Sequence, residues 1–441
     1  MGAFLAKPKS EKTNTEGRGP GLSYATAAMQ GWRVDMEDAH VAQIGLGPEG
    51  GAGRRWAFFG VFDGHAVSAA GPTEDEQERL PKRTVELLRR ALRAAFLQLD
   101  QRMKELPELT AGDERSGTTA VCALVTPSHL LVANLGDSRA VLSRNAAVFF
   151  TSDDHKPYMP KERERIVNAG GSVMIQRVNG SLAVSRALGD FEYKAVAALP
   201  PAQQLVSPEP DVYAIQRDAS KDEFLALACD GVFDVMSNAE MCDLVRQRMR
   251  VSSRLADVAN CLLDAGLSKG SRDNMSVVLI GLPGAPSVDS KAKAVDDALK
   301  AAVDKRAREV ARACASQVDL DIDSVTRTLS NESFDGLPPG GGIHALRELI
   351  QKAVDDVKAE LPSGETVGAR RQPSPTVPKT TAVGVAAGGG VGPGAGSTAP
   401  LKVRVVSSYI EQPATAARLS PTAAAPAAAA ASADIGGPSP N

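Results

Sequence analysis

Short apolar runs recur through the first 290 residues of the chain, and Gly, Asp or Asn bounds each of them. Runs of about four to eight residues that are rich in Val, Phe, Leu and Ala are typical of β-strands. The strands predicted in this way span residues 56–62, 118–125, 130–134, 140–142, 223–229 and 276–280. Because helices do not separate these strands one by one, the pattern favours antiparallel sheets over an alternating parallel sheet.

Three stretches between the strands carry the spacing of an amphipathic helix instead. In residues 84–106 the apolar positions fall on one helix face, and they are Val85, Leu88, Leu92, Phe96, Leu99 and Met103. Residues 239–249 and 255–267 show the same spacing. The first 290 residues are therefore predicted to form an α+β fold in which helices flank antiparallel sheets.

The composition changes twice towards the C-terminus. Residues 288–360 are dominated by Ala, Lys, Asp, Glu, Arg and Leu, which predicts a small helical unit. Beyond Pro362 the chain is rich in Gly, Pro and Ala, and such a segment buries too little apolar area to offset the entropy of ordering it. We therefore divide the chain into an N-terminal segment (1–22), an α+β domain (23–285), a helical subdomain (288–360) and a disordered tail (365–441).

Charge and cysteine content narrow the function classes. The chain has 441 residues and a formal net charge of −3, so it lacks the basic excess that nucleic-acid binding requires. No apolar run is long enough to span a membrane, and the N-terminus lacks the apolar stretch of a secretory signal. The five cysteines are scattered without a C-x-x-C spacing, which disfavours a zinc site and favours a reducing compartment.

Carboxylates recur at the ends of the predicted strands. They are Asp63, Asp137, Asp230 and Asp273, and Glu37 and Asp38 follow Arg33 near the N-terminus. A single Asp-Gly pair is ordinary turn chemistry, and spacing alone does not prove that the four strand ends converge. Carboxylates that do converge raise one another's pKa unless cations neutralise them. An all-oxygen set suits Mg²⁺ or Mn²⁺ better than zinc, and two such ions can activate a bridging water.

Eight short stretches together form a specific set of motifs. They run from Met29 to His40, Val61 to Ala66, Ser116 to Ala120, Asn134 to Arg139, Asp154 to Pro157, Asn168 to Asp190, Asp230 to Asp234 and Lys269 to Ser276. In these motifs the chain resembles the type 2C metal-dependent protein serine/threonine phosphatases (the PPM family), closest to the animal alpha, beta and N forms. The resemblance covers about residues 1–360.

The resemblance implies a four-layer αββα sandwich, in which helices flank two antiparallel β-sheets. It also implies hydrolysis of phosphoserine and phosphothreonine in proteins by a water that bridges two metal ions. In the family pattern Asp63 bridges both ions and the Gly64 carbonyl binds one of them. The other acidic positions that the resemblance implies for the metals, directly or through water, are Asp230, Asp273, Glu37 and Asp38, with Asp137 and Asp234 for a weaker third ion.

The resemblance also assigns residues to the substrate. Arg33 matches the arginine that holds the phosphate, and its planar fork suits two phosphate oxygens. His65 matches the general acid that protonates the leaving Ser or Thr oxygen. Arg177 matches a position that contacts the substrate, and a plain exposed arginine is the alternative. Asn274 is expected to orient the carboxylate before it, and Asp190 is expected to be structural.

The chain departs from the family pattern after Ala66. The family continues there with Gly and a long amphipathic helix, whereas residues Val67–Lys82 are mostly polar and that helix is missing. Apolar sheet left uncovered costs about 25 cal/mol per Å², against a total stability of about 5–15 kcal/mol. The alternative function is therefore a catalytically weak regulatory or scaffolding protein that still binds phosphoproteins.

Further expectations concern partners and location. Gly2 stands where the alpha and beta forms are N-myristoylated, although Ala6 replaces the Ser or Thr of the consensus. A single acyl chain gives weak membrane association. We expect phosphoprotein substrates, no nucleic acid, a monomer, and a cytoplasmic and nuclear location with some membrane association.

Overall fold

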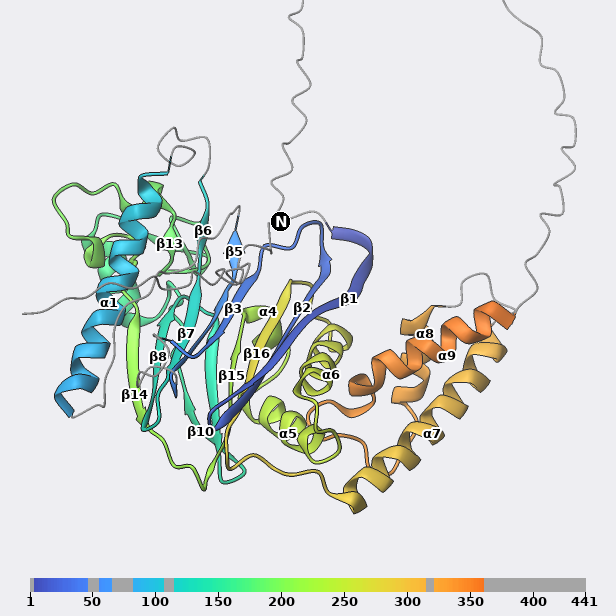
Figure 1. The fold of residues 1–441 in the computed structure, drawn as a ribbon. Helices are drawn as coiled ribbons and strands as arrows, with labels where there is room; N and C mark the ends of the chain where they lie inside the picture. The colour runs from blue at the N-terminus through green and yellow to red at the C-terminus, as the bar shows by residue number, and fades with distance from the viewer. Residues whose placement is uncertain (1–3, 47–54, 66–81, 107–114, 315–320, 361–441) are drawn as a thin grey trace, which may run out of the picture. The chain divides into compact units, whose positions relative to one another are not determined.

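The computed structural model describes residues 4–46, 55–65, 82–106, 115–314 and 321–360 (Figure 1). Gly2, the altered segment that follows His65 up to Pro81, and the tail predicted to be disordered at 365–441 lie outside these residues. Among the described residues, no helix combines the length and the apolar character that crossing a membrane requires.

Two antiparallel sheets lie at the centre of the fold (Figure 1). The six-stranded sheet has the order β1 (Phe4–Gly19), β2 (Leu22–Arg33), β16 (Met275–Gly281), β15 (Asp222–Ala228), β9 (Arg139–Arg144) and β10 (Ala147–Thr151). The five-stranded sheet has the order β14 (Asp211–Gln216), β8 (His129–Leu135), β7 (Ala120–Val125), β4 (Ala57–Phe62) and β3 (Ala39–Ile44). Neighbouring strands are antiparallel in both sheets, as the sequence pattern predicts.

The two sheets share one apolar core. On β4, Phe59 and Val61 are fully buried on the same face, because residues two apart on a strand point the same way. They belong to one buried cluster with Leu225 and Leu227 of β15 and Val278 of β16. Burial of apolar area at about 25 cal/mol per Å² makes this contact between the sheets a major source of stability.

Helices cover the outer face of each sheet. Helix α1 (Lys82–Lys104) lies along the five-stranded sheet, where Phe96 shares a buried cluster with Cys122 and Leu135 (Figure 1). Helices α5 (Asn238–Met249) and α6 (Leu255–Ser268) lie along the six-stranded sheet. These helices match the three predicted from the apolar spacing. The four-layer αββα arrangement that the resemblance implies is confirmed.

Short elements connect these layers. A three-stranded sheet contains β13 (Leu188–Gly189), β6 (Gly117–Thr118) and β5 (Gly64–His65). The hairpin of β11 (Val173–Met174) and β12 (Arg177–Val178) follows α3 (Pro160–Asn168). The remaining short helices are η2 (Phe191–Lys194), η3 (Pro201–Gln203) and α4 (Asp230–Phe233).

The residues after β16 form a helical subdomain, as the composition predicts. Its elements are α7 (Ser290–Cys314), α8 (Ile322–Ser330), η4 (Gly342–Leu346) and α9 (Arg347–Glu360). Val303, Val325 and Ile350, one from each α-helix, are fully buried in a shared cluster. Contacts of η4 and α9 with α6 attach this subdomain to the α+β domain.

Residues 4–19 belong to the six-stranded sheet. The sequence pattern sets residues 1–22 apart as an N-terminal segment, yet residues 4–19 form the edge strand β1 along β2. These residues are exposed or half-buried, so they lack the apolar alternation by which a strand is recognised. Contacts with α6 help to hold the strand: Lys12 Nζ lies 2.8 Å from Asp264, and Asn14 donates to Asn260.

Candidate active site

The acidic side chains singled out by the sequence lie at one end of the two facing sheets. Asp63 follows β4 and Asp137 follows β8 in the five-stranded sheet. In the six-stranded sheet, Asp230 follows β15 and Asp273 precedes β16, its antiparallel neighbour. The end of one antiparallel strand lies beside the start of the next, so this register gathers the carboxylates at one edge. The loop after β2 adds Asp38.

Two of these carboxylates and a thiol come especially close together. The ligand atoms of Asp38, Asp63 and Cys229 all lie within 4.8 Å of one another. Cys229 Sγ accepts a hydrogen bond from the Ser276 N–H at 3.2 Å, whereas both buried oxygens of Asp38 have no hydrogen-bond partner among the described residues. An unpartnered buried carboxylate is costly, so it indicates a group bound from outside. A hard divalent cation fits this place, because carboxylate oxygens are its preferred ligands.

Burial and mutual repulsion raise the pKa of several carboxyl groups in the cluster. Burial, with the charge of Asp273 nearby, raises the pKa of Asp38 to about 6. Burial and the charges of Asp137 and other carboxylates raise the pKa of Asp230 to about 8. For the same reasons the pKa of Asp63 lies well above its usual range. The ionised cluster therefore lacks positive charge, which a bound cation supplies.

Close packing of α4 against the loop before β16 brings Asp230 beside Asp273. A Cβ added to Gly231 would lie 2.1 Å from the carbonyl oxygen of Asn274 and 3.1 Å from Asp273 Cβ. No side chain fits in that space without moving backbone, so glycine is required there.

Asn274 connects the two loops that carry carboxylates. Its Nδ2 donates to the carbonyl oxygens of Gln30 at 2.8 Å and Asp35 at 3.0 Å. Its Oδ1 accepts from the Glu37 N–H at 2.7 Å, and its own N–H donates to Asp273 Oδ1 at 2.8 Å. The backbone N–H of Asn274 therefore contacts Asp273, while its side chain fixes the backbone of Glu37.

Two basic side chains of the chain itself reach the acidic cluster. Arg33 Nη2 lies 2.6 Å from Asp273 Oδ2, and these side chains are 37% and 31% exposed. Arg33 therefore lies on the accessible side of the cluster, where an incoming phosphate can reach it. Lys156 Nζ pairs with Asp137, whose side chain is only 4% exposed.

His65 is held by a buried carboxylate. Its Nε2 lies 2.9 Å from both carboxylate oxygens of Asp190. Although burial alone would lower it, the pKa of His65 is raised because the ring bonds to Asp190 and faces Glu37 and Asp137. A Cβ on Gly117 would lie 2.2 Å from Asp190 Oδ2 and 2.6 Å from His65 Nε2, so this pair requires glycine at that position.

Gly64 and Asp234 also lie close to the cluster. Gly64 is buried in β5, where it pairs with Thr118 of β6. Asp234 ends α4, and its N–H donates to the carbonyl oxygen of Asp230 at 2.7 Å. Burial raises the pKa of Asp234, and Asp137 adds to this effect against an opposing contribution of Lys156.

The structure adds contacts to the sequence-based interpretation at three residues. Arg177 is exposed in β12 and donates to the carbonyl oxygen of Ser181 in the turn that follows, and no contact among the described residues joins it to the cluster. Asp190, expected to be only structural, binds the candidate acid His65. Lys156, to which no role was assigned, pairs with Asp137. No short-range signal reveals the pairing of Asp190 with His65, because 125 positions separate the two residues.

Comparisons with known proteins identify the family. A sequence profile described as Protein phosphatase 2C matches residues 22–275. A second, described as Protein serine/threonine phosphatase 2C, C-terminal domain, matches residues 276–355. Protein phosphatase 1B of Mus musculus is 48% identical over 368 residues, which cover 80% of this chain and 93% of that protein. Protein phosphatase 1A of Bos taurus is 48% identical over 363 residues, which cover 80% of this chain and 94% of that protein.

Solved structures agree with the sequence comparisons. A phosphatase from a pathogenic strain of Toxoplasma gondii is similar with a TM-score of 0.50 and 26% identity, over 62% of this chain and 96% of that chain. Because the first profile spans more than half of the sequence, and because the relatives are 48% identical over most of their length, the chain belongs to the protein phosphatase 2C family.

Proposed function

We propose that the acidic cluster is the active site of a metal-dependent phosphatase that hydrolyses phosphoserine and phosphothreonine in proteins. Membership of the 2C family carries the reaction class, and the comparisons give no support to a scaffolding protein. The observation that carries the site is the buried carboxylate of Asp38, which has no partner among the described residues. It lies next to Asp63, whose pKa is raised. A cation bound between them would compensate the negative charge of both carboxylates.

The carboxylates around Asp38 fit divalent cations of the Mg²⁺ or Mn²⁺ type. Asp63, with Asp230, Asp273 and the Gly64 carbonyl, would hold two such ions. Glu37 and Asp38 would act on the water around them, and Asp137 and Asp234 would hold a weaker third ion. When bound, the cations neutralise the carboxylates, polarise the phosphoryl oxygens and lower the pKa of water. The chain's own residues supply the remaining steps.

Arg33 is the group that we assign to the substrate phosphate. Its guanidinium carries several donors in a planar fork, so it can bind two phosphate oxygens at once. It is 37% exposed and pairs with Asp273, so a phosphate held by Arg33 would lie next to the carboxylate cluster. In this position its charge stabilises the negative charge that spreads over the phosphoryl oxygens during transfer.

His65 is the group that we assign to the leaving oxygen. Asp190 binds Nε2 and favours the protonated ring, so a proton is available on Nδ1 near neutral pH. Transfer of this proton to the Ser or Thr oxygen prevents the release of an alkoxide, which is a poor leaving group.

The test is phosphate release from a phosphothreonine peptide by the purified full-length chain with Mn²⁺, with Mg²⁺ and with EDTA. Asp230→Asn is the site variant, and Asp243→Asn, on the exposed face of α5, is the matched control. We expect metal-dependent release that Asp230→Asn abolishes and Asp243→Asn retains. Absence of release from a protein that circular dichroism shows to be folded would overturn the proposed enzyme and favour a scaffold.

We further propose that the protein acts as a monomer on phosphoprotein substrates in the cytoplasm and nucleus. The support for acylation at Gly2 is the resemblance of the first residues to the alpha and beta forms. One acyl chain would give weak, reversible membrane association. Mass spectrometry of the N-terminal peptide, beside a Gly2→Ala variant, tests the acylation directly.

A further inference from the structure

The ammonium group of Lys156 occupies one side of the acidic cluster. Its Nζ pairs with Asp137, and its charge also acts on Asp230 and Asp234. Asp137 and Asp234 are the residues that the proposed function assigns to the weakest cation. The positively charged ammonium of Lys156 therefore lies where the proposed function expects a divalent cation to bind.

The backbone around Lys156 is fixed to the backbone around Asp137. The N–H of His155 donates to the carbonyl oxygen of Gly136 at 2.9 Å, and the Gly136 N–H donates to His155 Nδ1 at 3.1 Å. The residue before the lysine is thus bonded twice to the residue before the aspartate. These two hydrogen bonds hold the backbones of Lys156 and Asp137 close together, so that the lysine side chain reaches Asp137.

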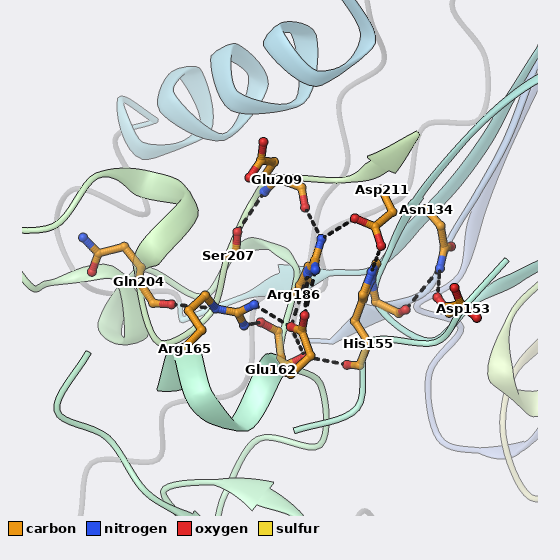
Figure 2. A network of polar contacts seen from close by, with 12 residues as sticks. Asn134, Asp153, His155, Glu162, Arg165, Arg186, Gln204, Ser207, Glu209 and Asp211 are labelled. Atoms are coloured by element: carbon orange, nitrogen blue, oxygen red, sulfur yellow. Dashed lines mark hydrogen bonds and ion pairs between the residues drawn. The ribbon is translucent and has the colours of Figure 1, made fainter. Parts of the chain in front are cut away.

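A buried polar network holds His155 in turn (Figure 2). The His155 carbonyl accepts from the N–H of Ser185 at 3.1 Å and from its Oγ at 2.8 Å. His155 Nε2 lies 3.2 Å from Asp211, which Arg186 contacts at 3.0 Å. Arg186 also lies 2.7 Å from Glu162, so the position of Lys156 depends on a rigid set of ion pairs.

The Lys156 side chain is partly exposed, whereas hydrogen bonds of the neighbouring His155 hold its backbone. Its side chain is 24% exposed, and a lysine keeps its charge and its flexible stem when the ammonium turns to water. The neighbouring Arg139 differs, because it binds Asp154 through two nitrogens at 2.9 and 2.8 Å. Such a two-point contact is hard to exchange, whereas a point charge on one oxygen exchanges readily.

We propose that Lys156 is a built-in competitor for the weakest divalent cation of the site. Its ammonium neutralises Asp137 until a cation displaces it, since the two positive charges repel each other on one carboxylate. This inference rests on the proposed function, because it takes Asp137 and Asp234 to be cation ligands. It makes the filling of this position depend on the concentration of free divalent cation, while the positions around Asp63 fill first.

The test is calorimetric titration of Mn²⁺ into the full-length chain after EDTA treatment and buffer exchange. Lys156→Met removes the ammonium and keeps an unbranched side chain, and Lys156→Gln is a second neutral variant. Lys161→Met, on the exposed side of α3, is the matched control. We expect the weakest Mn²⁺ affinity to increase at least tenfold in both Lys156 variants, with less than a threefold change at the stronger positions and in the control.

The outcomes separate this inference from the proposed function. If the wild-type chain binds Mn²⁺ and the folded Lys156 variants show the same or a weaker last affinity, the competitor role is wrong and the phosphatase proposal stands. If the wild-type chain binds no Mn²⁺ at all, the cation site itself is wrong and the competitor role fails with it. Circular dichroism shows which variants are folded. A folded Lys156→Met or Lys156→Gln variant is by itself sufficient to decide whether Lys156 is a competitor.

Discussion

The polar network around Glu162 and the acidic cluster around Asp63 lie in the same domain, and both bury several charged side chains. In the network, Arg165 and Arg186 lie 2.5 and 2.7 Å from Glu162. Although burial would raise it, the pKa of Glu162 falls to about 2 because of these arginines. In the cluster, burial and like charges raise the pKa of Asp230 to about 8.

The difference between the network and the cluster shows how the chain distributes its counter-charges. The network pairs Glu162 with Arg165 and Arg186, and Arg186 also pairs with Asp211. It thereby fixes the backbone that carries His155. In the cluster, Arg33 pairs directly with Asp273 and Lys156 with Asp137, while the pKa of Asp63 and of Asp230 stays raised. Buried carboxylates that are compensated internally give rigidity, whereas carboxylates left short of positive charge give affinity for cations.

The largest effect is expected from Asp63→Asn, which removes a charge from the uncompensated cluster. Activity on a phosphothreonine peptide should fall about a thousandfold, because the assigned cation ligand and its electrostatic contribution are lost. The metal-free protein should at the same time become more stable by about 1 kcal/mol, since repulsion within the cluster decreases. Thermal unfolding in EDTA measures this gain. A lower Tm than that of the wild type would contradict the view that the cluster is overcharged.

The next effect is expected from Glu162→Gln, which removes a charge from the compensated network. The two arginines lose their shared partner, so the free energy of unfolding should fall by about 3 kcal/mol. Urea unfolding with and without Mn²⁺ measures this loss. Glu164→Gln, on the exposed side of the same helix, is the control and should change stability by less than about 0.5 kcal/mol. Equal stabilities of the two variants would remove the contrast between network and cluster.

Asp190→Asn tests the pair of His65 and Asp190, which belongs to the candidate site although its two charges compensate each other. Loss of the carboxylate that holds His65 should reduce turnover of a phosphothreonine peptide about 10- to 100-fold. Turnover of p-nitrophenyl phosphate should change much less, because its leaving group needs no proton. Measuring kcat on both substrates separates an effect on the acid from a general loss of structure. Equal losses on both would show that Asp190 has only the structural role expected from the sequence.

The remaining effect is expected from pH on the metal-free protein. The pKa of Asp230 is about 8 in the folded state and about 3.9 in the unfolded chain, so the folded state retains a proton that the unfolded chain has released. Stability should therefore fall, by at most about 3–4 kcal/mol, as pH rises from 5 to 8. Glu162 does not make the free energy of unfolding depend on pH between 5 and 8, because its lowered pKa affects stability only below about pH 5. Urea unfolding in EDTA measures the slope, and saturating Mn²⁺ should abolish it.

The hydrophobic pattern singles out Asp63, Asp137, Asp230 and Asp273, because each stands at the end of a predicted strand, which is a local signal. That these carboxylates gather in one site follows only from the family resemblance. The pattern predicted α1 for a similar reason, since Phe96 and its apolar neighbours repeat at helical spacing. Pairing partners carry no such signal. Strand β1 is held by backbone pairing and by contacts such as Lys12 with Asp264, which the hydrophobic pattern does not record.

The hydrophobic pattern does not predict the interior ion pairs either, because it does not record which residues the fold pairs. Arg186 and Glu162 look like ordinary surface residues in the sequence, and only the fold removes them from water together. Lys156 lies in a motif that the resemblance recognises, but its pairing with Asp137 follows from the contact between two loops. Such tertiary contacts decide which charges are compensated, and they depend on residues far apart in the chain.

The position of the acidic cluster across both sheets has a consequence for the order in which the protein folds. Glu37 and Asn274 bond to each other across 237 positions in the sequence, and contacts of this span form late because long loops must close first. The cation site exists only after the two sheets have docked. Cations should therefore leave the rate of folding nearly unchanged and slow unfolding instead, so that metal retention sets the lifetime of the native state.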